Sequence, residues 1–206
     1  MPHRIFFVIV LCLFFFNAAP SGAQEETNNS TRAKIGILIK SGECISGAKS
    51  HTRLKSGDSF RVYVQPEDRC VIYIIRTDEK RARLVNMTEQ TMHSSMLVLP
   101  SPREYFHVEG NSDAEQITII CSPLKLPELS PLEANDISFP RWASIQDTLI
   151  QKSQMILPAE NEEPISIGGT VRGLDTSSNG SAFVKKLRIY SGKGLLVKNY
   201  EFKVKK

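Results

Sequence analysis

Hydrophobic residues occur mainly in short runs separated by turn residues, a pattern typical of β-rich chains. Ser59–Gln65 alternates apolar and polar residues, which predicts a half-buried strand with Arg61 and Tyr63 on its solvent face. Cys70–Ile75 is apolar on both faces, which predicts a central strand of a sheet covered on both sides. Other expected strands are Ala33–Lys40, Arg83–Val85, Met96–Leu99, Glu104–Val108 and Glu115–Cys121, and residues 41–58 are expected to form a loop. This spacing predicts a mainly β fold, an antiparallel β-sandwich-like domain.

The residues after these strands change in character. Pro123, Pro127 and Pro131 recur at every fourth residue, with leucines between them. Proline has no backbone N–H and clashes with the preceding helical turn. We therefore expect residues 122–132 to form an extended, proline-rich strap that lies across the domain.

One helix is predicted beyond the strap. Trp142, Ile145 and Leu149 recur at helical spacing, and Pro140 stands where a first turn would begin. We expect a short amphipathic helix that ends near Ser153 and packs its apolar face on the sheet.

The last part of the chain predicts strands again, with Ile165–Val171 as the first candidate. Ala182–Tyr190 and Leu195–Lys205, joined by Ser191–Gly194, predict a C-terminal β-hairpin. Apolar and lysine residues alternate in the second of these segments, as expected for an edge strand.

The first residues have the pattern of an export signal. Arg4 precedes the unbroken apolar run Ile5–Phe16, and the small residues Ser21–Ala23 offer a cleavage site. The run has 12 residues, whereas a membrane-spanning helix needs roughly 20, so we expect no transmembrane helix after cleavage. The chain is thus expected to be periplasmic or secreted. Its expected parts are a signal peptide (1–23), a flexible leader (24–32), the β-sandwich-like domain (33–121), and the strap, helix and hairpin packed on that domain (122–206).

The net charge and the distribution of basic residues narrow the class of binding partner. Without residues 1–23 the chain has 25 basic and 22 acidic residues, a net charge of +3, which is too mild to predict binding to nucleic acid. Basic residues gather near the C-terminus, where alternate residues of the expected hairpin would share a face. This predicts a stripe for an anionic partner, either another envelope or secreted protein or an anionic envelope polymer; the alternative is a solubilising edge strand. The residues of this stripe are Lys185, Lys186, Arg188, Lys198, Lys203, Lys205 and Lys206.

Three cysteines follow the expected signal peptide, and in an oxidising compartment an odd number predicts one disulfide and one free thiol. Cys70 opens one apolar strand and Cys121 closes another, so antiparallel neighbours would bring them together. We expect a disulfide between Cys70 and Cys121, while pairings that involve Cys44 stay open.

Patterns for catalysis and for cofactors are weak. Ser46–Lys49 and Ser122–Lys125 have Ser-x-x-Lys spacing, but the Ser-Asp-Asn and Lys-Thr-Gly companions of that enzyme class are missing. The histidines lack the spacing of metal ligands, and no glycine-rich phosphate-binding loop is present. We expect no catalytic, cofactor-binding or metal-binding residues. The alternative is a small exported hydrolase with a cysteine or serine nucleophile.

Two stretches of the chain resemble a known family. The first comprises Leu54–Phe60 (LKSGDSF), Arg61–Pro66, Val71–Ile75 with its Tyr73, and the acidic turn Asp78–Glu79. The second comprises Leu97–Pro100, Glu104–Val108, Ala114–Cys121 and Ser122–Pro123. Together they cover about residues 54–123, and their order of strands and turns resembles the bacterial domain of unknown function 4384 family.

The resemblance implies a β-rich extracytoplasmic or accessory module without known catalysis. Relatives of this domain are joined to caspase-like peptidases or kinases, where they look like sensing or interaction parts. The chain departs from the family pattern at Lys80–Asn86, where two arginines stand in place of a glycine turn and an apolar segment. We expect a non-catalytic binding or accessory module of the bacterial cell envelope.

Overall fold

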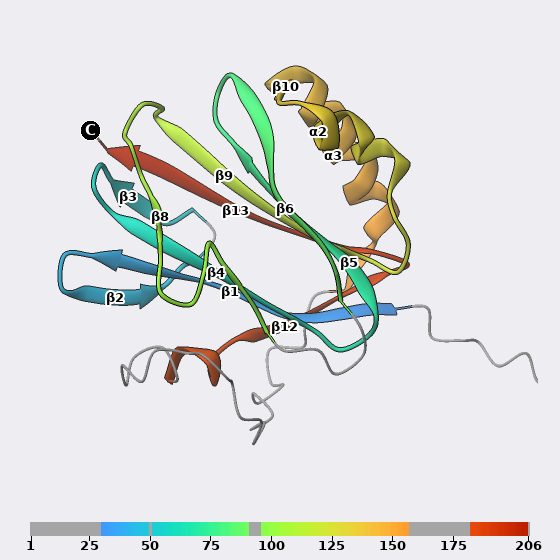
Figure 1. Cartoon of the computed structure of the whole chain (residues 1–206), viewed down its shortest axis with the longest axis horizontal. Helices are drawn as coiled ribbons and strands as arrows, with labels where there is room; N and C mark the ends of the chain where they lie inside the picture. The colour runs from blue at the N-terminus through green and yellow to red at the C-terminus, as the bar shows by residue number, and fades with distance from the viewer. Residues whose placement is uncertain (1–29, 50, 91–95, 157–181, 206) are drawn as a thin grey trace, which may run out of the picture.

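Two β-sheets, antiparallel except for one strand pair, face each other and enclose the main core (Figure 1). The computed structural model describes residues 30–49, 51–90, 96–156 and 182–205. Sheet A has seven strands, which are β1 (Ser30–Ser41), β2 (Cys44–Gly47), β4 (Ser59–Pro66), β7 (Leu97–Leu99), β8 (Phe106–His107), β11 (Met155–Ile156) and β12 (Arg188–Lys193). Sheet B has six strands, which are β3 (Arg53–Lys55), β5 (Cys70–Thr77), β6 (Arg81–Gln90), β9 (Ala114–Ser122), β10 (Ile137–Ser138) and β13 (Leu196–Lys205). The expected mainly β, sandwich-like fold is confirmed.

Alternate residues of both sheets fill the space between them, as the period of a strand dictates. The rings of Phe60 from sheet A and Phe202 from sheet B lie with their centres 6.0 Å apart, so the two sheets are in direct contact. β5 lies between β6 and β9 and is buried on both faces, which confirms the central strand predicted from its apolar sequence. Other core residues between the sheets include Ile35, Ile37, Val62, Ile72, Ile74, Ile117 and Ile119.

A helical layer covers the outer face of sheet B (Figure 1). Its elements are η1 (Pro127–Leu129), α2 (Ser130–Ala134) and α3 (Phe139–Ser153). Trp142 and Leu149 of α3 are fully buried in one cluster with residues of β5 and β9, including Tyr73 and Ile120. The predicted amphipathic helix is confirmed: it begins at Phe139, has Pro140 in its first turn and ends at Ser153.

The extended strap expected over residues 122–132 is wrong in its second half, which is helical. Pro127 and Pro131 occupy the first turns of η1 and α2. The N–H groups of a first turn have no partner inside the helix, so a proline is tolerated there. Leu129 and Leu132 are buried in the cluster beneath α3, which explains the leucines between the prolines.

β4 is covered on both faces, contrary to the half-buried strand that its alternation predicts. Arg61 is 3% exposed and Tyr63 is fully buried. A segment far along the chain packs on this outer face of sheet A, with the ring centres of Phe183 and Tyr63 5.3 Å apart. A β-carbon at Gly36 would lie 2.4 Å from the side chain of Leu187, so this close approach requires glycine.

The two C-terminal strands follow each other closely, as expected, but their hydrogen-bonded partners lie in different sheets. β12 pairs with β1 in sheet A and β13 pairs with β9 in sheet B, so the pair is not a hydrogen-bonded hairpin. A β-carbon at Gly192 would lie 2.1 Å from the carbonyl oxygen of Leu195, so the sharp passage between the sheets requires glycine. β13 is not an edge strand, because β3 pairs with Lys203–Lys205. The expected strand Ile165–Val171 lies outside the described residues.

Two further boundaries differ from the sequence prediction. β1 begins at Ser30, so the last residues of the expected flexible leader are strand, and Thr31 is buried there. The expected loop of residues 41–58 contains β2 and β3. The predicted signal peptide lies outside the described residues. In the described ranges, no helix has the length and apolar character needed to cross a membrane.

Candidate binding groove

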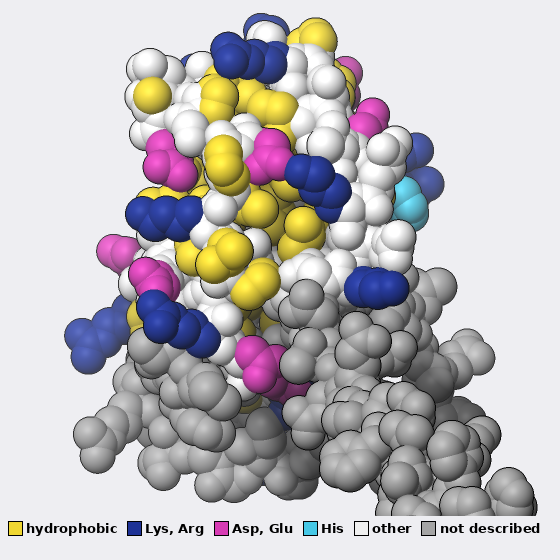
Figure 2. All heavy atoms as spheres, turned by 90° about the vertical axis from the view of Figure 1, so that its right-hand side faces the viewer, with side chains coloured by type: hydrophobic (Ala, Val, Ile, Leu, Met, Phe, Trp, Pro, Cys, Tyr) yellow, Lys and Arg dark blue, Asp and Glu magenta, His cyan; other side chains and the backbone are white. Residues whose placement is uncertain are grey.

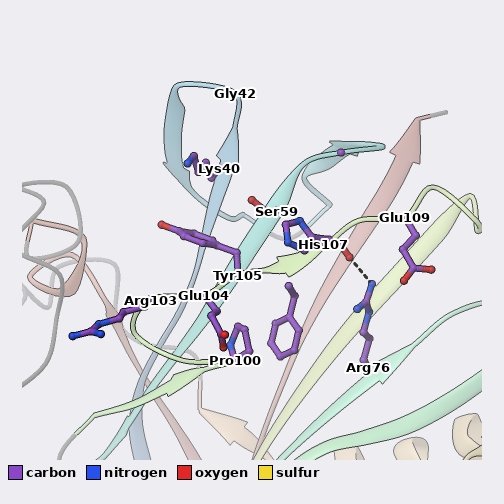
Figure 3. A pocket seen from close by; sticks show the side chains of 12 residues that line it. Lys40, Gly42, Ser59, Arg76, Pro100, Arg103, Glu104, Tyr105, His107 and Glu109 are labelled. Atoms are coloured by element: carbon purple, nitrogen blue, oxygen red, sulfur yellow. Dashed lines mark hydrogen bonds between the residues drawn. The ribbon is translucent and has the colours of Figure 1, made fainter.

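An open groove of about 750 Å³ lies at one end of the sandwich (Figure 3). β1 and β5 end here and β4 begins here, while the segment between β7 and β9 runs across the opening. Neighbouring strands of opposite direction bring residues that are distant in sequence to the same end of the sheets. The charged, polar and aromatic side chains of the lining include Lys40, Ser59, Arg76, Arg103, Tyr105 and His107.

Backbone hydrogen bonds fix the segment that crosses the groove. The N–H of Val108 donates to the carbonyl oxygen of Asp58 at 2.9 Å, and the N–H of Gly57 donates to the carbonyl oxygen of Val108 at 3.0 Å. The carboxylate of Asp58 in turn accepts the N–H of Lys55 at 2.8 Å. Gly57 has a φ of 90°, a conformation that favours glycine. One rim of the groove is therefore a rigid turn, and this turn belongs to the first stretch that carries the family resemblance.

Tyr105 stands at the groove in contact with two cations. The guanidinium carbon of Arg61 lies 4.0 Å from the centre of the Tyr105 ring, and Nζ of Lys40 lies 5.9 Å from the same centre. Both distances are within the range of a cation–π interaction. Nε of Arg61 also donates to the carbonyl oxygen of Glu104 at 2.9 Å, one residue before the tyrosine. The buried arginine thus fixes both the backbone and the ring of this part of the groove.

Within the described part of the chain, no carboxylate forms an ion pair with Lys40, Arg61 or Arg103. The guanidinium of Arg61 is nevertheless almost completely removed from solvent. A buried charge without a counter-charge is unfavourable. The lining of the groove also includes the acidic residues Glu104 and Glu109, so the groove carries both signs of charge.

Arg76, on the other side of the groove, already has its partners. Its Nη2 donates to the carbonyl oxygen of His107 at 3.0 Å, and it forms an ion pair with the buried Glu115 (Figure 3 shows the first contact). Beyond it lies a second hollow of about 450 Å³, in which two further arginines pair with Asp136 at 3.3 and 3.1 Å. Arg76 therefore joins the two hollows and holds β5 to the crossing segment.

Glu115 gives the stability of the fold a dependence on pH. Burial raises the pKa of the Glu115 carboxyl above its ordinary value of 4.5, and the neighbouring Arg76 only partly opposes this. As pH rises above that value, the unfolded chain ionises this carboxyl more readily than the folded chain, so the folded state loses stability. We expect the unfolding free energy of the wild type to fall from acid toward neutral pH, relative to that of Glu115→Gln. Urea unfolding of both proteins at several pH values measures this difference, and parallel curves would contradict it.

The two core cysteines are neighbours, as predicted. Cys121 lies opposite Ile72 in the β5–β9 ladder, and Cys70 is two residues from Ile72 on the same strand face. Their buried thiols are hydrogen-bonded to each other, which lowers the pKa of Cys70, while that contact together with burial raises the pKa of Cys121. All three described cysteines, including the exposed Cys44, are free thiols in the structure, so the disulfide itself stays a prediction.

The predicted basic stripe does not lie on one face of the protein. Lys203 and Lys205 are exposed on the outer side of β13, while the residues that alternate with them along the strand point into the core. Lys198 is on the opposite side, with Nζ 4.9 and 5.2 Å from the ring centres of Tyr190 and Tyr200, and burial lowers its pKa. The prediction of a shared face is wrong because Lys198 is an odd number of residues from Lys203 and Lys205, which places it on the other face of the strand. Of the remaining stripe residues, Lys185, Lys186 and Arg188 lie before or at the start of β12 in the other sheet, and Lys206 is outside the described residues.

The serines singled out by spacing do not lie in the groove lining. Ser46 is exposed on β2, and Ser122 is buried at the end of β9. The structure instead places Ser59 opposite His107 in the pairing of β4 with β8, a proximity that no local motif predicts. No hydrogen bond between these two side chains is present in the described part of the structure, and no group of three possible metal-ligating residues occurs there.

Apolar side chains reach the surface on a different side of the molecule. Figure 2 shows hydrophobic side chains in a central band of the side at the right of Figure 1, with charged side chains at its margins. Leu124 is 75% exposed, and Phe139 and Ile150 of α3 are 39% and 43% exposed. Phe139 and Ile150 lie outside the groove lining and provide control positions.

Sequence reasoning did not single out the residues that form the groove. The alternation of β4 placed Arg61 on a solvent face, whereas the segment before β8 covers it. Two features of the sequence could have indicated the groove. One is the arginine in an otherwise apolar strand, and the other is the charged and aromatic sequence Arg103–Phe106 after two prolines. Comparisons of the chain with protein-family models, curated proteins and solved structures found no match.

Proposed function

We propose that the protein is an exported, non-catalytic β-rich module that binds another component of the bacterial cell envelope through the groove at the end of the sandwich. The partner is an envelope or secreted protein or an anionic envelope polymer. The pattern of the first residues supports export, and the resemblance of residues 54–123 to a family of accessory domains supports a binding role.

The observation that carries the proposal is the fixed ring of Tyr105. A half-exposed aromatic side chain in an open groove offers a large contact area, and its stacking on Arg61 means that little conformational freedom is lost on binding. Tyrosine and arginine are also the residues that most often dominate binding energy at protein surfaces. A tyrosine that is held in place beside two cations therefore suits recognition.

The substitution Tyr105→Ala tests this role of the groove. We expect the affinity of the full chain for isolated cell-envelope fractions to fall about tenfold, or about 1.4 kcal/mol, because the main aromatic contact is lost. Co-sedimentation with envelope fractions measures the change. The matched control is Phe139→Ala, which removes an exposed aromatic ring from α3 and should leave affinity unchanged.

Two results would contradict the proposal. Equal loss of binding in both variants would show that the groove has no special role. Turnover of an ester or envelope polymer by the wild type, abolished in Ser59→Ala or Cys44→Ala, would favour the hydrolase alternative. Export has its own test: the N-terminus of the protein recovered from the envelope compartment should lie near Gln24.

A further inference from the structure

We propose that the free edge of β6 pairs with the same edge of a second copy of this chain, which gives a twofold dimer with Thr88 at its symmetry axis. The two strands are antiparallel, so the two copies of sheet B join into one continuous sheet. The inference goes beyond the proposed function, because residues 84–90 of β6 do not line the groove.

β6 is a long strand with a partner on only one side for most of its length. β5 pairs with it along one side, whereas β10 on the other side pairs only with Arg81 and Ala82. In the part of the chain that the structure describes, no strand pairs with residues 84–90 on that second side. A row of unpaired backbone N–H and C=O groups is a template for another strand.

Most other strands at the margins of the two sheets have features that oppose such pairing. Six of them have only two to four residues, and very short edge strands resist pairing; they are β2, β3, β7, β8, β10 and β11. Residues 196–202 of β13 lack a partner on one side, but Lys198 points inward there, which also opposes pairing. Residues 84–90 of β6 include neither lysine nor proline.

A β-bulge limits the regular part of this edge. The pairing of β5 with β6 shifts between Ile74 and Ile75, and Val85 is the extra residue on β6. A bulge bends the strand and increases its twist, so it opposes pairing locally. Beyond the bulge, residues 86–90 pair with β5 in a regular register.

The direction of the backbone groups in this regular stretch follows from the β5–β6 turn. The N–H of Asp78 donates to the carbonyl oxygen of Arg81 at 3.0 Å, so the backbone groups of Arg81 point toward β5. Direction alternates along an antiparallel strand, and the extra residue of a bulge shifts the alternation by one. Asn86 therefore points toward β5 as well, and the N–H and C=O groups of Met87 and Glu89 point away from it.

An antiparallel second copy with Thr88 at the axis matches these groups. Met87 of each copy then lies opposite Glu89 of the other, and residues paired in this way exchange backbone hydrogen bonds. On the inner face, Asn86 lies opposite Gln90 of the other copy, and two amide side chains can donate to and accept from each other. The two Thr88 side chains form a favourable cross-strand pair. The matches identify an identical stretch as the partner.

The charges at this edge do not oppose pairing. The carboxylate of Glu89 forms an ion pair with Arg69 of its own chain, so it needs no partner from the second copy. Residues 84–90 include no other charged side chain. The regular ladder is short, so we expect a weak and reversible dimer. If the groove binds the envelope as proposed above, the dimer presents two grooves to one surface, and avidity strengthens binding.

Sedimentation equilibrium of the full chain, at protein concentrations up to about 1 mM, measures the dimer. Met87→Pro removes an outward N–H from each copy and leaves the hydrogen bonds to β5 in place, because proline is tolerated where the N–H of an edge strand faces solvent. It should raise the Kd of the dimer about tenfold. The matched control Met87→Ala keeps the N–H and should dimerise as the wild type does. Thermal unfolding of both variants checks that the fold is retained.

The variants Thr88→Lys and Thr88→Glu test the position of the axis. Each variant alone places two like charges side by side in the dimer, which destabilises it. Each should therefore be monomeric at concentrations where the wild type dimerises. An equimolar mixture of the two variants should form a heterodimer, because opposite charges then meet at the axis.

Three results would overturn the inference. One is a wild type that stays monomeric at every concentration. Another is a dimer that Met87→Pro does not weaken, since a different surface then holds the two copies. The third is dimerisation of both Thr88 variants on their own, which would exclude the axis at Thr88. None of these results concerns the groove, which Tyr105→Ala tests separately.

Discussion

Replacement of Trp142 by alanine should lower the free energy of unfolding by about 4 kcal/mol, the cost of removing a fully buried tryptophan side chain. Trp142 is the only tryptophan of the chain, and its exposed fraction is 0%. It packs in the cluster that joins α3 to β5 and β9, so alanine would leave a cavity between the helical layer and sheet B. A domain of this size has a total stability of about 5–15 kcal/mol, so the change would remove a large part of it.

Urea unfolding followed by circular dichroism measures this loss, because the variant has no tryptophan fluorescence. Ile150→Ala is the matched control on the same helix, since Ile150 is 43% exposed and its truncation should change stability by less than about 0.5 kcal/mol. Trp142→Phe adds a graded test: it leaves a smaller cavity and removes an indole N–H that has no hydrogen-bond partner among the described residues. It should therefore be clearly more stable than Trp142→Ala. Similar stabilities for all these variants would mean that α3 does not hold sheet B.

The elements that sequence predicted well are those whose signal is local. The helical spacing of Trp142, Ile145 and Leu149 defines one apolar helix face, and this does not depend on which part of the protein covers that face. The unbroken apolar run of β5 requires cover on both faces, and the structure supplies it from sheet A and α3. In both cases the residues of the element alone carry the information.

The errors arose where distant segments decide the outcome. Alternation in β4 describes which residues are polar, but Phe183, 120 residues later, covers Tyr63 on the face that was expected to meet solvent. Turn residues at Ser191–Gly194 suit both a hairpin and a passage between two sheets. The choice depends on pairing with β1 and β9, which no local pattern encodes.

The groove is a tertiary feature of the same kind. The groove residues Lys40 and Tyr105, and the buried Arg61 that stacks on the tyrosine, come from three segments that meet only because β1, β4 and the segment before β8 share one end of the sandwich. None of them belongs to a motif with fixed spacing. An arginine in an apolar strand indicates that some group of the protein must interact with it. The sequence does not predict that this group is the ring of a tyrosine.

Oxidation of Cys70 and Cys121 to a disulfide should raise the free energy of unfolding by about 4 kcal/mol, the value that the chain-entropy model gives for a loop of this length. The two thiols are already hydrogen-bonded within the core, so little rearrangement of β5 and β9 is needed. Both thiols are buried in the folded protein, so a disulfide oxidant of the envelope is expected to reach them during folding. The oxidant is reduced to two thiols as the protein disulfide forms.

Mass spectrometry of the protein recovered without reductant should therefore find one Cys70–Cys121 cross-link and a free Cys44. Reduction should lower the urea midpoint of the wild type, and it should have no effect on the double variant Cys70→Ala/Cys121→Ala. Cys44→Ala is the control, since Cys44 is exposed on β2 and its removal should leave the cross-link intact. Protein from the envelope compartment with three reactive thiols after unfolding would contradict both this pairing and the oxidising location on which it depends.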